Sequence, residues 1–230
     1  MSIRALLSRA DGSDTDVDLA ERTPPRPRED ELLWVDAQST DPDERKIITA
    51  ALHLTENSAA VFEAIPSAPR AIVHADAVEV VGLAPTEDPD EDPVPLQVLV
   101  GDGWVITNHE GEIPFLDEHR ESIQDQREVG RLTSVEFLVS LLDWWVDAFF
   151  HVAERLEREV DELDDAALRA EGNLLDRLVA MRRRIARVRR TIVAHRGVAA
   201  ELSRPDFNAG TGASGRGRAG GRRESSRARG

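Results

Sequence analysis

The stretch TSVEFLVSLLDWWVDAFFHVAERLEREVDEL, residues 133–163, decides the fold of this chain. Its apolar residues recur every three or four positions, which is the spacing that places side chains on one stripe of an α-helix. Thr133 and Glu136 have the spacing of a capping box, a signature of a helix start. We therefore predict one α-helix of about eight turns over this stretch.

A second apolar stripe with the same spacing follows in LLDRLVAMRRRIARVRRTI, residues 174–192, and extends toward Leu202. Between the two stripes, Gly172 suits the end of one helix and Asn173 the start of the next. Two long helices that are joined by so short a loop must lie antiparallel. The sequence therefore predicts a long antiparallel helical hairpin over residues 132–207.

The two predicted helices carry opposite charges. The first is rich in Asp and Glu, and the second contains six arginines between residues 182 and 190. Folding back at residues 168–173 places position 157 opposite about 182, and 154 opposite about 185. We predict that the charges meet along this seam, at Glu154, Glu157, Glu162, Arg182, Arg184 and Arg187. Exposed pairs contribute only about 0–1 kcal/mol each, so the apolar stripes hold the hairpin together and the charges select its pairing.

Residues 31–131 have the pattern of an α/β domain. Short apolar runs predict strands near residues 32–35, 71–74, 78–83, 96–100 and 104–107. Gly101-Asp102-Gly103 predicts a tight turn, and so an antiparallel hairpin, between the last two. Asp41-Pro42 predicts the start of a helix that reaches about residue 55, and a further helix is expected at 114–127. The acidic, proline-rich residues 85–95 predict a loop.

The two ends of the chain differ from the middle. Residues 1–30 are acidic and rich in proline, and we predict a disordered leader there. Residues 208–230 hold mostly glycine and arginine and offer no apolar side chain larger than alanine, so this tail should be disordered as well.

The composition excludes several functions. The chain has no cysteine, so disulfides, thiol catalysis and cysteine-ligated metals are excluded. Its 44 acidic against 29 basic residues give a net charge of −15. The most apolar window, residues 137–150, is interrupted by Asp143 and Asp147 and is too short for a membrane span. We expect a cytoplasmic protein that does not insert into a membrane.

No catalytic constellation or cofactor motif is recognisable, so we predict that the protein is not an enzyme. The nearest approach to a metal-ligand set is Asp143, Asp147, His151 and Glu154, which fall along one helical face. Carboxylates there could hold Mg²⁺ through its water shell. Because the same positions form the solvated flank of the helix, we assign no metal site. We expect at most weak binding of Mg²⁺ or Co²⁺ at the acidic surface.

The arginine-rich helix and tail leave a nucleic-acid-associated role as an alternative. Residues 1–170 carry a net charge of −25, however, and the tail lacks aromatic residues that could stack on bases. Nucleic acid is therefore not the favoured partner.

Several segments, in this order, resemble the CorA family of magnesium and cobalt transporters. They are Leu33-Trp34-Val35-Asp36, the strand 104–109 ending in Thr107-Asn108-His109, the helix start at 133–136, and the helix pair 141–147 and 174–190. The resemblance spans residues 31–207. It implies that Trp34 and Asp36 lie on the first strand, and Thr107 and His109 at the end of an inner strand. Asn108 departs from the apolar residue that is usual in the family.

The resemblance implies an N-terminal cytosolic domain, with a mixed sheet flanked by helices and a projecting hairpin. In the family this domain lies on the cytoplasmic side of the cell membrane, senses divalent cations and gates a homopentameric pore. The family's stalk helix, membrane spans and Gly-Met-Asn triplet are not found here, since the only methionines are Met1 and Met181. We therefore expect a truncated metal-sensing domain that cannot conduct ions alone. The alternative is a stand-alone module that binds divalent cations or joins full-length transporter subunits.

Overall fold

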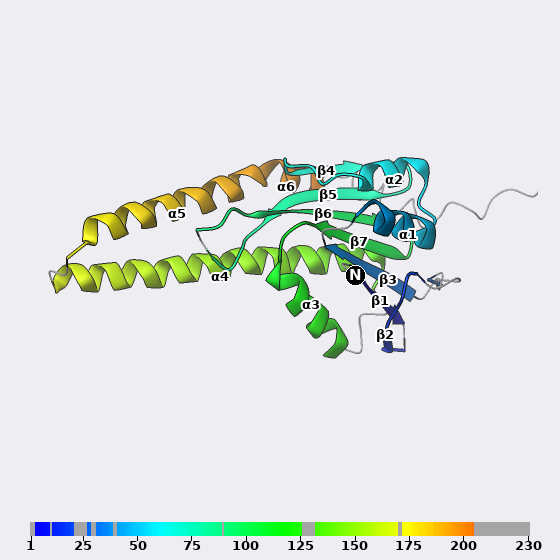
Figure 1. Cartoon of the computed structure of the whole chain (residues 1–230), viewed down its shortest axis with the longest axis horizontal. Helices are drawn as coiled ribbons and strands as arrows, with labels where there is room; N and C mark the ends of the chain where they lie inside the picture. Colours follow the sequence, from blue (N-terminus) through cyan, green and yellow to red (C-terminus); the bar gives the residue numbers. More distant parts are fainter. Residues whose placement is uncertain are drawn as a thin grey trace, which may run out of the picture.

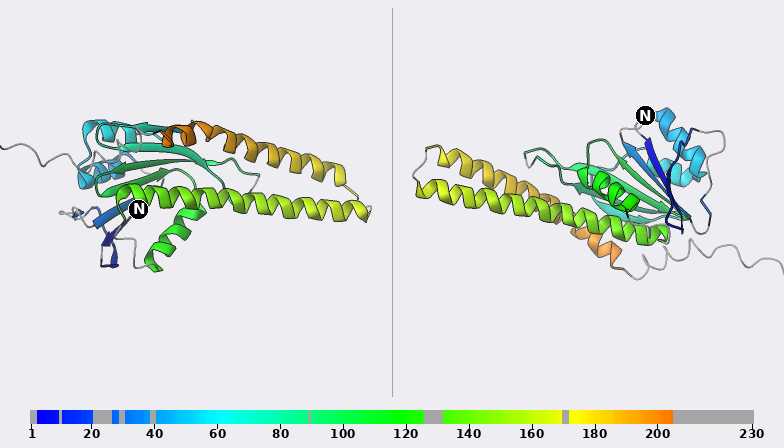
Figure 2. Two further views of the ribbon diagram at one scale, coloured as in Figure 1. Left: turned by 180° about the vertical axis from the view of Figure 1, so that it is seen from behind. Right: turned by 90° about the horizontal axis from the view of Figure 1, so that it is seen from below.

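A computed structural model describes residues 3–9, 11–20, 27–28, 31–38, 41–88, 90–125, 132–169 and 172–204. The predicted Gly/Arg tail at 208–230 lies outside these residues. A mixed β-sheet with helices on both faces forms one end of the molecule, and a long helical hairpin projects from it (Figures 1 and 2). The predicted fold class is confirmed.

The sheet has seven strands among the described residues, in the order β2-β1-β3-β7-β6-β5-β4. Neighbouring strands pair antiparallel except β3 and β7, which are parallel. Gly103, in the predicted tight turn between β6 and β7, has φ 76, which favours glycine. The bounds are β1 Ile3–Arg9, β2 Asp14–Asp16, β3 Glu31–Gln38, β4 Arg70–Val73, β5 Val78–Ala84, β6 Val94–Gly101 and β7 Trp104–His109.

The prediction of a disordered leader over residues 1–30 was wrong for its first half. β1 pairs along its whole length with β3, and Ala5, Leu6 and Leu7 are buried. Leu19, beyond β2, is buried as well. The acidic residues between positions 11 and 18 obscured a short strand whose apolar side chains contribute to both faces of the sheet.

The helices follow the predicted pattern with one addition. They are α1 Pro42–Leu52, α2 Glu56–Phe62, α3 Pro114–Asp125, α4 Ser134–Leu168, α5 Leu174–Ala194 and α6 Arg196–Leu202. Asp41 and Thr133 cap α1 and α4, each in a full capping box. Asn173 occupies the predicted cap position of α5, but in a left-handed conformation without a side-chain hydrogen bond. The short helix α2, capped by Thr55, was not predicted.

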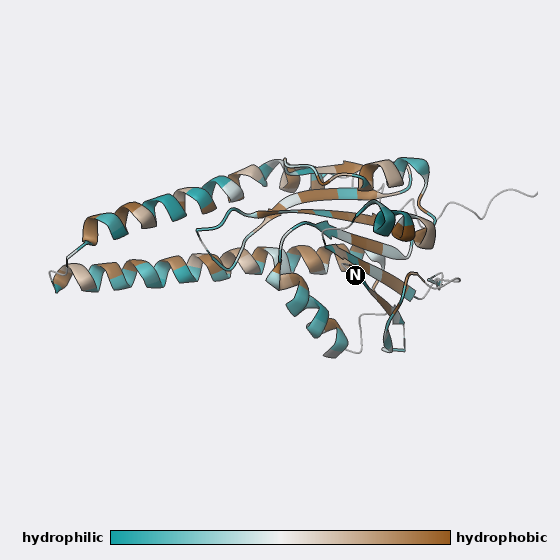
Figure 3. Ribbon diagram, viewed as in Figure 1, coloured by the Kyte–Doolittle hydropathy of each residue, from teal (hydrophilic) through white to brown (hydrophobic). Residues whose placement is uncertain are grey.

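Each face of the sheet carries its own apolar core. Trp34 and Phe137 belong to the core beneath α3 and α4, whereas Val35, Ile48 and Phe62 belong to the core beneath α1 and α2. The strands between them are largely apolar (Figure 3). Alternate residues of β3 therefore enter opposite cores, as the pleat of a strand requires.

The hairpin is held by a third, smaller core. Val152, Leu156 and Leu163 of α4 pack with Met181 of α5. The predicted second stripe is only partly buried, because its members Leu178, Ile185 and Ile192 are exposed.

The predicted loop at 85–95 ends earlier than expected, because β6 begins at Val94. The remaining acidic loop extends from the sheet along one side of the hairpin (Figure 2), where Thr86 accepts from Arg155 of α4 and Asp90 pairs with Arg184 of α5. This loop places carboxylates beside the base of the hairpin.

Candidate functional site

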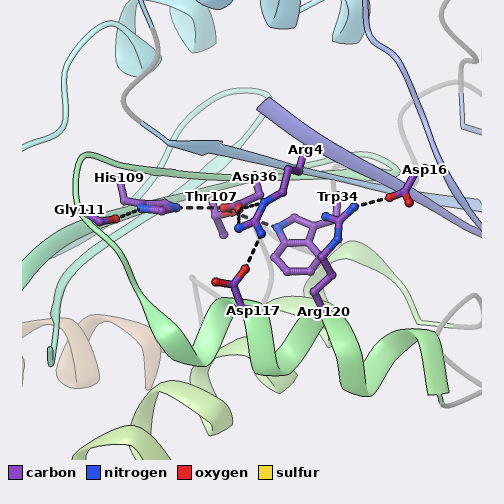
Figure 4. Close-up of polar contacts among 9 residues, drawn as sticks. All are labelled: Arg4, Asp16, Trp34, Asp36, Thr107, His109, Gly111, Asp117 and Arg120. Atoms are coloured by element: carbon purple, nitrogen blue, oxygen red, sulfur yellow. Dashed lines mark hydrogen bonds and ion pairs between the residues drawn. The ribbon is translucent and has the colours of Figure 1, made fainter. Parts of the chain in front are cut away.

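The four family-motif residues converge on one buried carboxylate (Figure 4). The parallel register of β3 and β7 places Asp36 beside Thr107. The Thr107 hydroxyl donates to Oδ1 of Asp36 at 2.7 Å and accepts from Nε1 of Trp34 at 3.1 Å. Nε2 of His109 lies 3.1 Å from the same Oδ1. We call Trp34, Asp36, Thr107 and His109, with Arg4, the Asp36 network.

Arg4 is the member of the network that the sequence did not suggest. The antiparallel pairing of β1 with β3 sets it beside Asp36, and its Nη2 donates to Oδ2 of Asp36 at 2.6 Å. Its other terminal nitrogen donates to Asp117 on α3. Arg4 thereby links the buried carboxylate to a carboxylate at the surface.

The neighbours of the Asp36 carboxylate favour its ionised form. The Nδ1 of His109 lies 2.6 Å from the carbonyl oxygen of Gly111, which can only accept a hydrogen bond. Both ring nitrogens of His109 thus face acceptors, the carbonyl of Gly111 on one side and the Asp36 carboxylate on the other. Burial alone would raise the pKa of Asp36, but the hydrogen bond and charge of His109, with the bonds from Thr107 and Arg4, lower it.

The Asp36 network is closed to ligands. Asp36, Thr107, His109 and Trp34 are each at most 2% exposed. The arrangement joins β1, β3, β7 and α3 to one another, and Arg4 is its solvent-exposed member, with 43% of its side chain exposed.

A second polar chain lies on the opposite face of the sheet. The amide of Asn108 donates to Oε1 of Gln97 at 3.0 Å, and the amide of Gln97 donates to Oε1 of Glu79 at 2.7 Å. Glu79 is fully buried and also accepts two hydrogen bonds from Arg70. The buried amide of Asn108, which replaces the apolar residue usual in the family, thus has a hydrogen-bond partner in Gln97 on the neighbouring strand.

The four weak metal candidates on α4 do not form a binding site. Asp143, Asp147, His151 and Glu154 are all exposed. In the described part of the chain, no three His, Asp or Glu side chains are grouped so that they could hold a metal ion. The structure does not bring these four together.

The predicted charge seam is shifted, and the acidic loop takes part in it. Nη1 of Arg184 lies 2.5 Å from Glu159 rather than near Glu157, and its Nη2 pairs with Asp90. Arg187 lies 3.6 Å from Asp92. Within the described chain, no ion pair joins Arg182 to the predicted acids, which are Glu154, Glu157 and Glu162.

A hollow lined by carboxylates lies between the acidic loop and the start of α3. Its volume is about 860 Å³, and no arginine or lysine is among the described residues that line it. The acidic residues of this hollow, which we call the acidic hollow, are Glu87, Asp88, Glu91, Asp92, Glu112, Asp117 and Glu118. Asp92 also belongs to the ion pair with Arg187, and Asp117 to the one with Arg4. The hollow therefore touches both the hairpin and the Asp36 network.

None of the helices in the described ranges combines the length and the hydropathy that a membrane crossing requires.

Sequence comparison relates most of the chain to one family. Residues 29–213 match the sequence model of the family described as CorA-like Mg²⁺ transporter protein. No curated protein sequence matches the chain significantly.

Solved structures share the fold at low sequence identity. Full-length CmaX is similar with a TM-score of 0.72 and 18% identity, over 92% of this chain and 66% of that one. The complete CorA magnesium transporter of Methanocaldococcus jannaschii gives 0.71 and 14%, over 92% and 68%. The cytoplasmic domain of ZntB from Vibrio parahaemolyticus gives 0.66 and 12%, over 94% and 87%. The chain thus spans about two thirds of the full-length proteins and most of the separate cytoplasmic domain.

Proposed function

Because this chain belongs to the CorA-like Mg²⁺ transporter family, we propose that it acts as a cation-responsive regulatory domain of a divalent-cation transport system. Its family is one of transporters and not of enzymes. The likeness to separately solved cytoplasmic domains supports a place on the cytoplasmic side of the membrane. Full-length transporter subunits are the partners that this function implies.

The acidic hollow is the observation that carries the proposal. Seven carboxylate residues line it, and of these Asp92 and Asp117 pair with arginines that lie outside the lining, Arg187 and Arg4. Such a surface concentrates divalent cations by its field. Since no three ligands converge, we infer weak binding in which Mg²⁺ keeps most of its water shell, as this ion commonly does.

The ion pairs of the loop provide a route from cation binding to the hairpin. Asp92 would face both a cation in the hollow and Arg187 on α5, and the neighbouring Asp90 pairs with Arg184. A cation that binds near the Asp92 carboxylate weakens the attraction between Asp92 and Arg187. Because a cation binds better to the arrangement in which Asp92 is released from Arg187, cation binding shifts the acidic loop toward an arrangement less tightly held to the hairpin.

The test is a thermal-unfolding titration of the chelator-treated protein with Mg²⁺ in the millimolar range. Sodium chloride at matched ionic strength separates specific binding from general screening. We expect Mg²⁺ to raise the melting temperature further than matched sodium does, because a ligand of the native state stabilises it. Equal curves in the two salts would overturn the proposal.

A triple variant tests whether the Mg²⁺ response of the melting temperature comes from the acidic hollow. Replacing Asp88, Glu91 and Asp92 by their amides removes charge from the hollow. The matched control replaces Glu157, Asp161 and Asp164, exposed acids of α4, by their amides. The Mg²⁺ response should persist in the control and be lost in the hollow variant, and the reverse result would place the cation elsewhere.

A further inference from the structure

The face of α5 that points away from α4 is open to solvent. Met181 and Val188 lie on the opposite face of α5, where they pack against residues of α4 in the core of the hairpin. An α-helix turns by about 100° per residue, so the outward face can be read from the sequence. The residues that lie about 120–180° around the helix from both inner positions are Leu175, Val179, Ala186 and Val193. In Figures 1 and 2, no other described element lies beyond α5 on the side away from α4.

Three of these four outward residues have large, exposed aliphatic side chains. Leu175, Val179 and Val193 are 74%, 42% and 50% exposed. Together with Ala186 they form an apolar row, which we call the outward stripe. At the usual rise per residue the outward stripe is about 27 Å long. A row of exposed aliphatic side chains on a helix that already buries one apolar face marks an interaction surface.

Arginines border the outward stripe on both sides. By the same helical angles, Arg182 and Arg189 fall on one side of it, and Arg183 and Arg190 on the other. All four are exposed, and within the described part of the chain none of them forms an ion pair. The whole of α5 carries seven arginines against one acid, Asp176. The outward face of α5 is therefore apolar along its middle and cationic on both flanks.

This pattern fits the surface of an anionic lipid bilayer. Helices that lie on a bilayer combine aliphatic side chains, which enter the headgroup region, with basic side chains on their polar flanks. The apolar stem of an arginine lies along such a surface while its charged end reaches a lipid phosphate. The planar guanidinium group binds a phosphate through two parallel hydrogen bonds. The cytoplasmic leaflet of a membrane offers such phosphates together with a negative surface potential.

Two other anionic partners fit the outward face less well. A nucleic-acid backbone would pair with the arginines, but it has no apolar surface for Leu175, Val179 and Val193. An acidic partner helix binds best in a groove between elements, whereas the surface around Arg182 and Arg189 is lined by residues of α5 alone. A flat lipid surface can contact one convex helix along its whole length.

The acidic helix α4 does not oppose such a contact strongly. It packs against the inner face of α5, so α5 itself separates the carboxylates of α4 from a surface bound at the outward stripe. The axes of packed helices are about 8–10 Å apart. The Debye length at physiological ionic strength is about 8 Å, so the repulsion between those carboxylates and anionic lipids is largely screened.

We propose that the outward stripe and its four arginines dock α5 lengthwise on an anionic phospholipid surface. Leu175, Val179 and Val193 enter the headgroup region, and the arginines on either side of them bind lipid phosphates. The contact is peripheral and requires no helix that crosses the bilayer. This inference does not rest on cation binding and goes beyond the proposed function.

Co-sedimentation of the full chain with lipid vesicles, in the absence of Mg²⁺, tests the proposal. Vesicles of phosphatidylglycerol and phosphatidylcholine in equal parts should bind the wild type. Vesicles of phosphatidylcholine alone should bind it about tenfold more weakly or worse, because they lack the negative surface potential. A chain that binds neither kind of vesicle, or both kinds equally, would overturn the proposal.

A pair of arginine variants assigns the binding to α5. Arg182→Gln combined with Arg189→Gln should weaken binding to the anionic vesicles about tenfold or more, since each arginine at an anionic surface adds to the attraction. The matched control combines Arg222→Gln with Arg223→Gln in the Gly/Arg tail and removes the same charge. It should weaken binding by less than about threefold. A larger loss in the tail variant than in the α5 variant would refute docking through α5.

Removing apolar side chains distinguishes a lipid surface from other polyanions. Leu175→Ser combined with Val179→Ser keeps every arginine and should still weaken vesicle binding about tenfold, since less apolar area enters the headgroup region. The control combines Ile72→Ser with Val73→Ser, on the exposed edge strand β4, and should leave binding unchanged. Circular dichroism establishes that each variant is folded. Full binding by the Leu175/Val179 variant would mean that α5 attracts any polyanion, nucleic acid included, and would overturn the proposal.

Discussion

The imidazole of His195 rests on the backbone of Gly82, so that a Cβ atom on Gly82 would lie 2.7 Å from Nε2 of His195. The same Cβ would lie 2.7 Å from the ring of Trp145. The glycine allows the corner between α5 and α6 to approach β5, where the amide of Leu83 donates to His195. The absence of a side chain at Gly82 thereby permits the contact between the hairpin and the sheet.

We predict that Gly82→Ala destabilises the protein by about 1–3 kcal/mol, because the buried ring of Trp145 and the half-buried ring of His195 must shift to admit one methyl group. Urea unfolding measures the change. Gly197→Ala, in α6, is the matched control, since a Cβ there would meet nothing within 4 Å and alanine favours a helix. Equal effects at the two positions would show that the close approach at Gly82 has no energetic consequence.

From the environment of His119 we predict that the free energy of unfolding decreases in mild acid. The ring is 3% exposed, is packed among the rings of Trp34, Phe137 and Trp144, and lacks a hydrogen-bond partner for either nitrogen among the described residues. Burial lowers its pKa to about 4. The pKa of His119 in the folded state lies below its unfolded value of about 6.5, so protonation of this ring favours the unfolded state. The free energy of unfolding therefore keeps its full value above pH 6.5 and decreases as the pH falls toward 4.

The measurement is the free energy of unfolding at several pH values between 7 and 4, for the wild type and His119→Phe. The wild type should lose about 3 kcal/mol more than the variant over this range. His195, whose pKa burial also lowers against an opposing hydrogen bond to Thr191, contributes in the same direction in both proteins. Parallel pH profiles would refute a role for His119.

Asp36→Asn should cost about 3–5 kcal/mol, since it leaves the Arg4 guanidinium without its buried carboxylate and disturbs the buried hydrogen bonds with Thr107 and His109. Asp117→Asn serves as the control because it removes only the exposed end of the Arg4 ion pair, and we expect a change below about 1 kcal/mol. Denaturant unfolding at neutral pH distinguishes the two. A small effect at Asp36 would mean that the network is not needed for stability.

The pair of Asp90 with Arg184 should couple weakly and in a salt-dependent manner. Asp90 is 57% exposed at its side chain, so a double-mutant cycle with Asp90→Asn and Arg184→Gln should give only a small coupling energy, which decreases with added salt. The control cycle pairs Asp90→Asn with Arg182→Gln and should give no coupling. A coupling that salt leaves unchanged would indicate a desolvated contact instead.

The sequence predicted the elements that local patterns encode. The apolar stripes located α4 and α5, the capping residues Asp41 and Thr133 located two helix starts, and the glycine-flanked turn located the hairpin of β6 with β7. It did not reveal β1, whose few apolar residues precede an acidic segment. It also missed α2, because seven residues are too few for a helical period to be recognised.

The sequence by itself determined an α/β domain with a helical hairpin, because periodicity and capping act between residues close together along the chain. The tertiary structure decided which side chains meet. Arg4 bonds with Asp36 across 32 positions, His109 with Asp36 across 73, and Arg184 with Asp90 across 94. Such contacts depend on strand order, register and loop placement, which are set by packing over the whole molecule and leave no periodic trace in the sequence.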